Sequence, residues 1–389
     1  MQSLKIDNGI IKAKKALMGP SLHPVKNIHL EITDGVLTQV KAHPTATTRE
    51  VLNATHSTLL PGLVDCHVHL ALDGINFKDC MEKWHSPGLM ASHIKKQLNA
   101  GLEQGLTYFR DGGDRGGQAL TFKNSSPTNL PIKASGAALR IQKMYGTFLG
   151  PGLKKEQIKE AIAFLAGKNA DPIKVLVSGI VSFKEYGRVG PQQFDLPLLQ
   201  QIVNSARKEG LKVMAHANSD EAVKICIQAG VHSVEHGYFI THDTLKMMAE
   251  KDIYWIPTIV PVANQLKKPY RDRFTKDELY VIEKTYKRQQ EMLCWACEWG
   301  VTVGVGTDAG ASGVMHGTGF HEELQLYRKA GLSCETILRT ATINGAKLLG
   351  LDSGLEQGKP LRFTAVAGDP LEDLDILKTP EYICLHTPC

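Results

Sequence analysis

The chain has 389 residues, 42% of them hydrophobic, and its 45 basic and 40 acidic residues give a formal net charge of +5. This size accommodates one large core with a small companion domain. Acidic and basic residues are interspersed along the chain, which argues against a nucleic-acid partner. No apolar stretch reaches membrane-spanning length, which argues against a membrane partner. We expect a cytoplasmic enzyme that acts on a small-molecule substrate, with homo-oligomer formation left open.

The two ends of the chain both predict short strands separated by turns, without a helical period. The predicted strands are 6–12, 28–33, 36–40, 56–60, 354–359 and 361–366. Neither end is long enough to bury much surface alone. We therefore predict that residues 1–60 and 346–389 combine into one small β-sandwich-like domain.

Between these ends, from residue 61 to 345, short apolar strands alternate with amphipathic helices. Helical patterns include 197–209 and 220–229, and Ser219 is the predicted N-cap of the second. Eight alternations over this length predict an α/β fold, a (β/α)8 TIM barrel. The eight predicted strands are 63–70, 106–112, 131–139, 172–178, 211–217, 231–236, 253–258 and 301–308.

The first predicted barrel strand carries His67 and His69, one residue apart. Side chains on a strand alternate between its faces, so both imidazoles point the same way and can share one metal ion. Because such a barrel places its chemistry at the carboxyl ends of its strands, residues there are expected to converge with this pair. The ligand-type residues of the later strands are Lys174, His216, His236 and Asp308.

Four imidazoles and a carboxylate suit two divalent ions, zinc or a similar metal. Two ions about 3.5–4 Å apart need a bridging anion, and these five residues leave that position unfilled. Lys174 lies on an apolar strand, where desolvation and nearby cations lower the pKa of a lysine. Its neutral amine could then react with carbon dioxide to form an anionic carbamate. A structural lysine paired with a carboxylate is the alternative.

These six residues lie in the motifs Pro61-Gly62-Leu63-Val64-Asp65-Cys66-His67-Val68-His69, Ile173-Lys174, Ala215-His216-Ala217, Val234-Glu235-His236-Gly237 and Gly306-Thr307-Asp308. Together the motifs resemble the binuclear amidohydrolase superfamily, most closely its imidazolonepropionase-like group, which includes Xaa-Pro dipeptidases. The resemblance covers nearly the whole chain. It implies that His67 and His69 with Asp308 hold one ion, and that His216 and His236 hold the second. Carboxylated Lys174 would bridge the two ions.

The resemblance also implies a metal-dependent hydrolase that cleaves an amide C–N bond of a small molecule. Such a molecule is a dipeptide, an N-acyl amino acid or a cyclic amide. A hydroxide that bridges the two ions would attack the carbonyl carbon. Asp308 would act as the catalytic group, which takes the proton of the hydroxide and passes it to the leaving nitrogen.

Two other functions are kept as alternatives. A mononuclear aminohydrolase, which deaminates a heterocycle, shares this barrel. By family pattern it carries a glutamate three residues after the strand-five histidine, as imidazolonepropionases do as a rule, and this chain has Ser219 there. A non-catalytic scaffold is the other alternative, but such relatives typically lose ligands, whereas this chain keeps the full set.

Substrate contacts are expected in the loops that follow the barrel strands. Tyr145 is the preferred contact, because a hydroxyl reaches a carboxylate or an oxyanion without the desolvation cost of a charge. Arg188 is a cation for a terminal carboxylate. His316 and His321 follow Asp308 and either bind substrate or face water. The loops after the third and fourth strands also offer Arg140, Lys184 and Tyr186.

Other conspicuous residues are given no role in the chemistry, and Glu235 is left unassigned. Cys66 falls between the paired histidines, and Glu235 precedes His236. Alternation along a regular strand points both away from the metal site. Cys294 and Cys297 form a C-x-x-C spacing with no second cysteine pair to complement it, so we predict a structural role.

Overall fold

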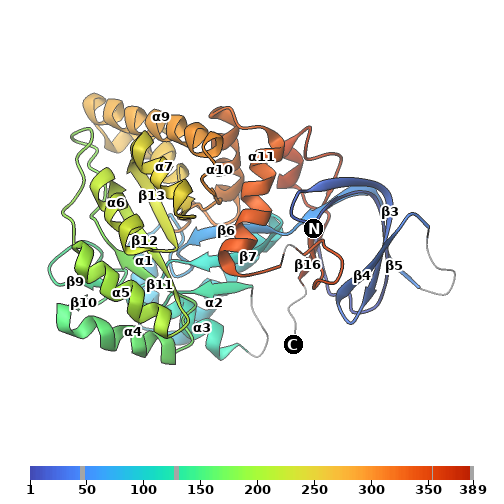
Figure 1. The fold of residues 1–389 in the computed structure, drawn as a ribbon, viewed down its shortest axis with the longest axis horizontal. Coiled ribbons are helices and arrows are strands. Elements are labelled where there is room, and N and C mark those ends of the chain that lie inside the picture. The colour runs from blue at the N-terminus through green and yellow to red at the C-terminus, as the bar shows by residue number, and fades with distance from the viewer. Residues whose placement is uncertain (44–48, 127–130, 353, 386–389) are drawn as a thin grey trace.

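The computed structural model describes residues 1–43, 49–126, 131–352 and 354–385. Its larger part is a barrel of parallel strands surrounded by helices (Figure 1). The barrel strands are β6 (Leu63–Val68), β7 (Leu106–Asp111), β8 (Ile132–Ala134), β11 (Pro172–Leu176), β12 (Lys212–Ser219), β13 (Ser233–Phe239) and β14 (Tyr254–Ile256). They form two parallel groups, in the orders β6-β7-β8 and β11-β12-β13-β14.

Isolated backbone bridges join these groups into a closed barrel, namely Leu139–Val175, Trp255–Val303 and Val68–Ala309. Residues 301–309 thus occupy the eighth position, and the predicted TIM barrel is confirmed. The eighth segment forms no continuous ladder, however, where we predicted a regular strand. The Thr307 N–H in this segment is shared between the Asp65 carboxylate, at 3.1 Å, and the His67 carbonyl oxygen, at 3.2 Å.

Helices cover the outside of the barrel (Figure 1). Their bounds are α1 (Phe77–Lys83), α2 (Pro87–Glu103), α3 (Gln118–Ser125), α4 (Ile158–Gly167), α5 (Leu196–Lys208), α6 (Asp220–Ala229), α7 (His242–Glu250), α8 (Val260–Ala263), α9 (Lys276–Glu298), α10 (Thr318–Lys329), α11 (Cys334–Arg339) and α12 (Gly345–Leu349). Helix α6 matches the predicted span 220–229. Ser219 caps it as predicted, because its hydroxyl accepts a hydrogen bond from the Ala222 N–H at 3.2 Å.

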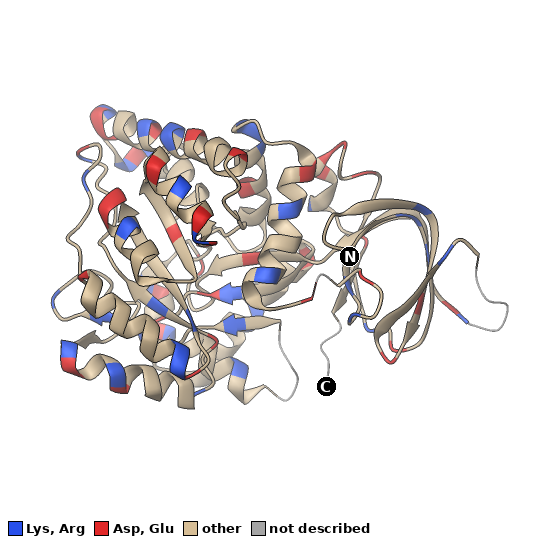
Figure 2. Ribbon diagram, in the orientation of Figure 1, with Lys and Arg blue, Asp and Glu red and all other residues tan. Residues whose placement is uncertain are grey.

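Several short elements lie between these strands and helices. They are β9 (Arg140–Ile141), β10 (Gly152–Leu153), the 3₁₀ turns η1 (Lys155–Gln157), η2 (Asn264–Leu266), η3 (Tyr270–Arg273) and η5 (Leu374–Lys378), and the π-helical turn η4 (Thr340–Asn344). Among the described helices, none has the length and apolar character needed to cross a bilayer. Acidic and basic residues are interspersed along the outer helices (Figure 2), which is the pattern of a solvated surface.

The smaller part of the structure is a β-sandwich domain formed from both ends of the chain, as predicted (Figure 1). Its strands are β1 (Gln2–Leu4), β2 (Gly9–Met18), β3 (His23–Thr33), β4 (Val36–Lys41), β5 (Glu50–Pro61), β15 (Arg362–Ala367) and β16 (Tyr382–Leu385). They pair in the order β1-β16-β15-β5-β2-β3-β4. The buried side chains of Ile11, Leu30 and Phe363 belong to one apolar cluster inside this domain.

Two details in the C-terminal part of this domain differ from the sequence-based expectation. Residues 354–359 form turns instead of the predicted strand, because Gly354 and Gly358 both adopt left-handed backbone angles, with φ of +87° and +83°. Strand β16 was not predicted, since its four residues are too few to show an alternation. It is held between β1 and β15 by backbone pairing from both sides.

Candidate metal centre

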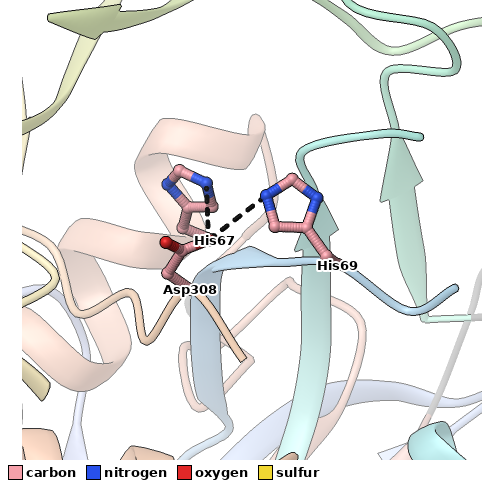
Figure 3. A group of neighbouring side chains, drawn as sticks. All are labelled: His67, His69 and Asp308. Carbon is pink, nitrogen blue, oxygen red and sulfur yellow. Dashed lines mark ion pairs between the residues drawn. The ribbon is translucent and has the colours of Figure 1, made fainter. Parts of the chain in front are cut away.

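The end of β6 and the end of the eighth segment bring His67, His69 and Asp308 together (Figure 3). The Asp308 Oδ1 atom lies 3.2 Å from His69 Nε2 and 3.6 Å from His67 Nε2. One ligand atom from each of the three residues lies within 4.8 Å of the others. Two imidazole nitrogens and a carboxylate oxygen at this spacing form a donor set that suits a divalent ion.

Each of three histidines is oriented through its Nδ1 atom. His67 Nδ1 lies 2.9 Å from Glu235 Oε2, His69 Nδ1 lies 2.7 Å from the Gly113 carbonyl oxygen, and His236 Nδ1 lies 2.6 Å from Thr258 Oγ1. Because these contacts engage Nδ1, the Nε2 atoms are the ones that would bind a metal ion, and Lys174 Nζ lies 3.2 Å from that of His67. This arrangement is typical of histidines that bind metal ions, so these residues fit a divalent metal ion.

The other predicted ligands gather beside this cluster. The Lys174 Nζ atom on β11 lies 3.2 Å from His67 Nε2. The ring centroid of His236 lies 5.0 Å from that of His67 and 4.6 Å from that of His216. All six predicted ligand residues line one cavity of about 510 Å³ at the carboxyl ends of the barrel strands.

The protonation of most of these groups suits metal binding. His69 differs, because burial acts to lower its pKa but the hydrogen bond with Asp308 and the charge of Asp308 outweigh it and raise that pKa. Burial and the Lys174 charge lower the pKa of His216 to about 3, and burial also holds the pKa values of His67 and His236 well below the ordinary value. These imidazoles are therefore neutral. Burial acts to raise the pKa of Asp308, but the hydrogen bond with His69 and the nearby positive charges outweigh it and lower that pKa to about 2. Asp308 is therefore ionised.

Glu235 contributes to the site, although the regular-strand expectation pointed it away. Its Oε2 atom contacts His67 Nδ1 at 2.9 Å, and both of its oxygens accept hydrogen bonds from Arg110 at 2.9 Å. The alternation fails because His236 has a left-handed backbone with φ of +68°. That turn lets Glu235 and His236 both reach the barrel interior. In the sequence, this role could have been suspected from the position of Glu235 directly before a predicted ligand histidine.

A second carboxylate missed by the sequence analysis, Asp65, ties the two ligand-bearing segments together. It accepts the N–H of His67 at 3.2 Å and the hydroxyl of Thr307 at 2.7 Å. His67 and Asp308 are thus held next to each other by one buried side chain. The neighbouring Cys66 is buried in a separate apolar cluster with Val64 and Ile256, as its position in the alternation predicted.

Gly112, just after β7, leaves room for the imidazoles. A Cβ atom at this position would lie 2.9 Å from His69 Cε1 and 3.2 Å from His67 Nε2. Any larger residue would therefore displace a predicted ligand.

The predicted substrate contacts differ in whether they line the cavity. Tyr145 lines the cavity, and its ring centroid lies 5.6 Å from that of His216. Arg188 does not line it; its exposed guanidinium pairs with Glu185 at 3.0 Å. His316 is also absent from the lining, because it is buried with its Nε2 atom 3.0 Å from the Leu72 carbonyl oxygen. Neither Arg188 nor His316 lines the cavity in this structure, and their substrate contacts stay predictions.

The remaining residues singled out in the sequence are not among the described residues that line the cavity. His321 Nε2 lies 3.0 Å from the Gln104 carbonyl oxygen, away from the cavity. Arg140 is buried and donates to the carbonyl oxygens of Gly150 and Met144. Cys294 and Cys297 are free cysteines on α9, and their structural role stays a prediction. Lys184 and Tyr186 are not among the described residues that line the cavity.

A (β/α)8 barrel whose strand ends carry paired histidines, further histidines and an aspartate has the architecture of barrel hydrolases with a metal centre. A profile of the amidohydrolase family matches residues 58–383, and the chain belongs to this family. The expected superfamily is confirmed, and with it an enzyme that acts on C–N bonds.

Several known proteins are similar over almost the whole chain. An uncharacterised protein of Mycobacterium tuberculosis is 26% identical over 368 residues, which cover 92% of this chain and 91% of that protein. Ochratoxinase of Aspergillus niger is 23% identical over 398 residues, or 92% of this chain and 81% of that protein. The crystal structure of a Xaa-Pro dipeptidase with methionine bound in its active site has a TM-score of 0.81 and 24% identity, covering 96% of this chain and 97% of that one.

Proposed function

We propose that the chain is a binuclear metal-dependent hydrolase that cleaves an amide bond of a small molecule. The observation that carries this proposal is the position of Lys174. Its Nζ atom is buried at the cavity floor, and its one hydrogen-bond partner among the described residues is His67 Nε2, at 3.2 Å. A lysine that served only structure would be paired with a carboxylate at hydrogen-bonding distance.

Burial lowers the pKa of Lys174 to about 8, although the negative charges of Glu235 and Asp308 act to raise it. About one tenth of the amine is then neutral at pH 7, and the neutral fraction rises with pH. A neutral amine adds to carbon dioxide, forming an N–C bond and releasing one proton, and the product is a carbamate anion. That anion would supply the ligand shared by two metal ions. His67, His69 and Asp308 would hold one ion, and His216 and His236 would hold the other. Two zinc ions fit this set of donors.

Divalent ions held there would act as Lewis acids and lower the pKa of a bound water from 15.7 toward ~7. Asp308 is ionised, so it would accept a proton from that water and give it to the leaving nitrogen. Tyr145 lines the cavity as a hydrogen-bond donor for the carbonyl oxygen of the substrate. Burial raises the pKa of Tyr145, which keeps its phenol protonated and able to donate.

The placement of Ser219 favours amide hydrolysis over deamination. Its hydroxyl is engaged as the cap of α6, and it does not line the cavity. The expected position of the deaminase glutamate therefore offers no acid to a bound heterocycle. The similarity to a Xaa-Pro dipeptidase, whose name denotes cleavage of a peptide bond, supports the same choice.

A hydrolysis screen tests this function. The metal-loaded protein would be incubated with N-acyl amino acids, Xaa-Pro dipeptides, cyclic amides and aminoheterocycles. We expect release of a carboxylic acid and an amine from one of the amide classes. Release of ammonia from the heterocycles alone would contradict the proposal and support the deaminase alternative.

Metal content gives an independent test. Protein prepared with zinc and bicarbonate is expected to hold close to two ions per chain, because five side chains and a carbamate satisfy two sites. Elemental analysis of the purified protein measures this ratio. A maximum of one ion, unchanged by added zinc and bicarbonate, would contradict the binuclear centre.

Glu235→Gln is expected to weaken metal binding by ~10–100-fold, since a carboxylate that orients a ligand histidine contributes on this scale. Competition with a chelator of known affinity would measure the change. The substitution also leaves Arg110 without its buried partner, so thermal unfolding must be followed in the same samples. Glu283→Gln is the control, because Glu283 forms an exposed pair with Lys287 on α9. Equal metal affinity in both variants would show that Glu235 serves stability alone.

A further inference from the structure

A second cavity, of about 300 Å³, lies where the barrel strands begin. Pro172 and Lys212 line it and are the first residues of β11 and β12, and His232 lines it directly before β13. The end of α12 contributes Leu348 and Leu349 to the lining. The predicted metal ligands gather at the opposite, carboxyl ends of the same strands. The two cavities therefore lie on opposite faces of the barrel, and they share no described lining residue.

Three cations reach this cavity from the inner face of the barrel, namely Arg110, Lys133 and Lys212. Lys212 lies four residues before His216 on β12, so alternation places both side chains on the inner face, at opposite ends of the strand. Arg110 and Lys133 are partners in the ladder of β7 with β8, and such neighbours point the same way. The inner layer of a barrel of this kind is ordinarily filled by branched apolar side chains. Three cations there are a departure that packing alone does not require.

The carboxylates around this cavity are too few to neutralise its cations. Asp171 is the one acidic residue among the described residues that line it. Its oxygens lie 3.1 Å from Lys133 Nζ and 2.5 Å from Lys123 Nζ, so one carboxylate serves two lysines. Lys212 takes part in none of the ion pairs found in the described part of the chain. The lining thus carries more positive than negative charge, and Lys212 is its cation without a carboxylate.

Arg110 adds a fixed charge at the inner end of the cavity. It is only 4% exposed, and its guanidinium donates to Ser233 Oγ at 2.8 Å and to both Glu235 oxygens at 2.9 Å. These contacts hold the guanidinium in place beneath the other two cations. Burial and the charges of Arg110 and Lys133 lower the pKa of Lys212. The cations therefore repel one another across the cavity, and an anion bound between them would relieve that repulsion.

We propose that this cavity binds a tetrahedral oxyanion with about two negative charges, either inorganic phosphate or the phosphate group of a small ester. Lys133 and Lys212 would donate to its oxygens, and Arg110 would contribute charge from the inner end. The cations come from three different strands, so an anion whose oxygens point in several directions fits them. A planar carboxylate with one charge matches a single arginine fork instead. The site is separate from the metal ligands and does not depend on the proposed hydrolysis.

Sulfate is the probe for this site, because it has the required shape and stays fully ionised at neutral pH. Isothermal titration calorimetry of the metal-loaded protein would measure its binding, with chloride keeping the ionic strength constant. If each of the three cations contributes about tenfold, a Kd of ~1 mM is expected. Lys212→Gln is expected to weaken sulfate binding by about tenfold. Sulfate held at the metal ligands would not respond to this change, since Lys212 lies at the other end of β12.

Lys208→Gln is the matched control, because Lys208 is exposed on the last turn of α5 and does not line the cavity. It removes the same charge and is expected to keep the native affinity for sulfate. Thermal unfolding gives a second readout. At constant ionic strength, sulfate should raise the Tm of the protein with native residues and of Lys208→Gln by more than that of Lys212→Gln. Unfolding curves without sulfate establish that each variant is folded.

Further titrations identify the source of the anion. Inorganic phosphate and glycerol 2-phosphate would be compared, and the one whose affinity falls more in Lys212→Gln is the better ligand of this site. Acetate is expected to bind about tenfold more weakly than sulfate, because it carries less charge. Absence of saturable sulfate binding to the protein with native residues would overturn the proposal. Equal sulfate affinity in Lys212→Gln would also overturn it, since the anion would then lie elsewhere.

Discussion

Lys174→Ala is expected to abolish most hydrolytic activity and to weaken the binding of one or both metal ions. The substitution removes the amine that would become the bridging carbamate, and no other described anion lies in the cavity except Asp308. Without a bridge, the two sets of histidines lose the charge that holds two cations close together. Turnover and metal content would be measured on the same preparation, with circular dichroism to establish that the barrel is folded.

Lys15→Ala is the control for Lys174→Ala, because Lys15 is also buried but pairs with Asp369 in the β domain. It is expected to keep both ions. Adding a short carboxylic acid such as acetate or propionate to Lys174→Ala should restore part of the activity by occupying the empty position of the bridge. Full turnover and full metal content in Lys174→Ala would show that the lysine is structural.

The sequence was sufficient to predict the barrel and the gathering of the six ligand-type residues. His67 and His69 were predicted to share a face because side chains on a strand alternate with a period of two, and both line the cavity even though the pairing of β6 with β7 shifts register between Asp65 and Val68. The later residues converge because parallel barrel strands all end at the same rim. Both rules depend on local geometry and topology alone, so they needed no knowledge of side-chain packing.

Contacts that depend on a departure from regular geometry could not be predicted in this way. Glu235 reaches His67 because the backbone turns at His236, with φ of +68°, and Asp308 stands at a similar turn with φ of +55°. Left-handed angles at residues other than glycine are uncommon and have no clear sequence pattern. They cost about 1–3 kcal/mol each and are typical of functional sites.

Substrate contacts were the least predictable part of the site. Arg188 and Arg273 are both arginines on loops at the carboxyl ends of the strands, yet only Arg273 lines the cavity. The difference lies in long-range packing, since η3 is held against the mouth by contacts such as Phe274 with Phe183. His316 likewise follows Asp308 in sequence, but the chain folds it beneath the site against Leu72.

Asp308→Asn is expected to lower turnover by ~10²–10⁴-fold, which corresponds to about 3–5 kcal/mol of activation free energy. The amide has the same shape as the carboxylate, so the barrel should stay folded. It cannot accept a proton from the attacking water, nor return one to the leaving nitrogen. Steady-state kinetics on the best amide substrate from the screen would measure the loss, and Asp243→Asn on exposed α7 should keep normal turnover.

Metal content must be measured in the same Asp308→Asn samples, because Asp308 lies 3.2 Å from His69 Nε2 and is also expected to bind an ion. If the variant loses one ion and activity together, added zinc should refill the site without restoring turnover, since the proton acceptor is still missing. A folded variant that holds two ions and turns over the substrate at a near-normal rate would contradict the catalytic role of Asp308. The proton would then have to pass through another group that lines the cavity, and Tyr145 would be the next residue to substitute.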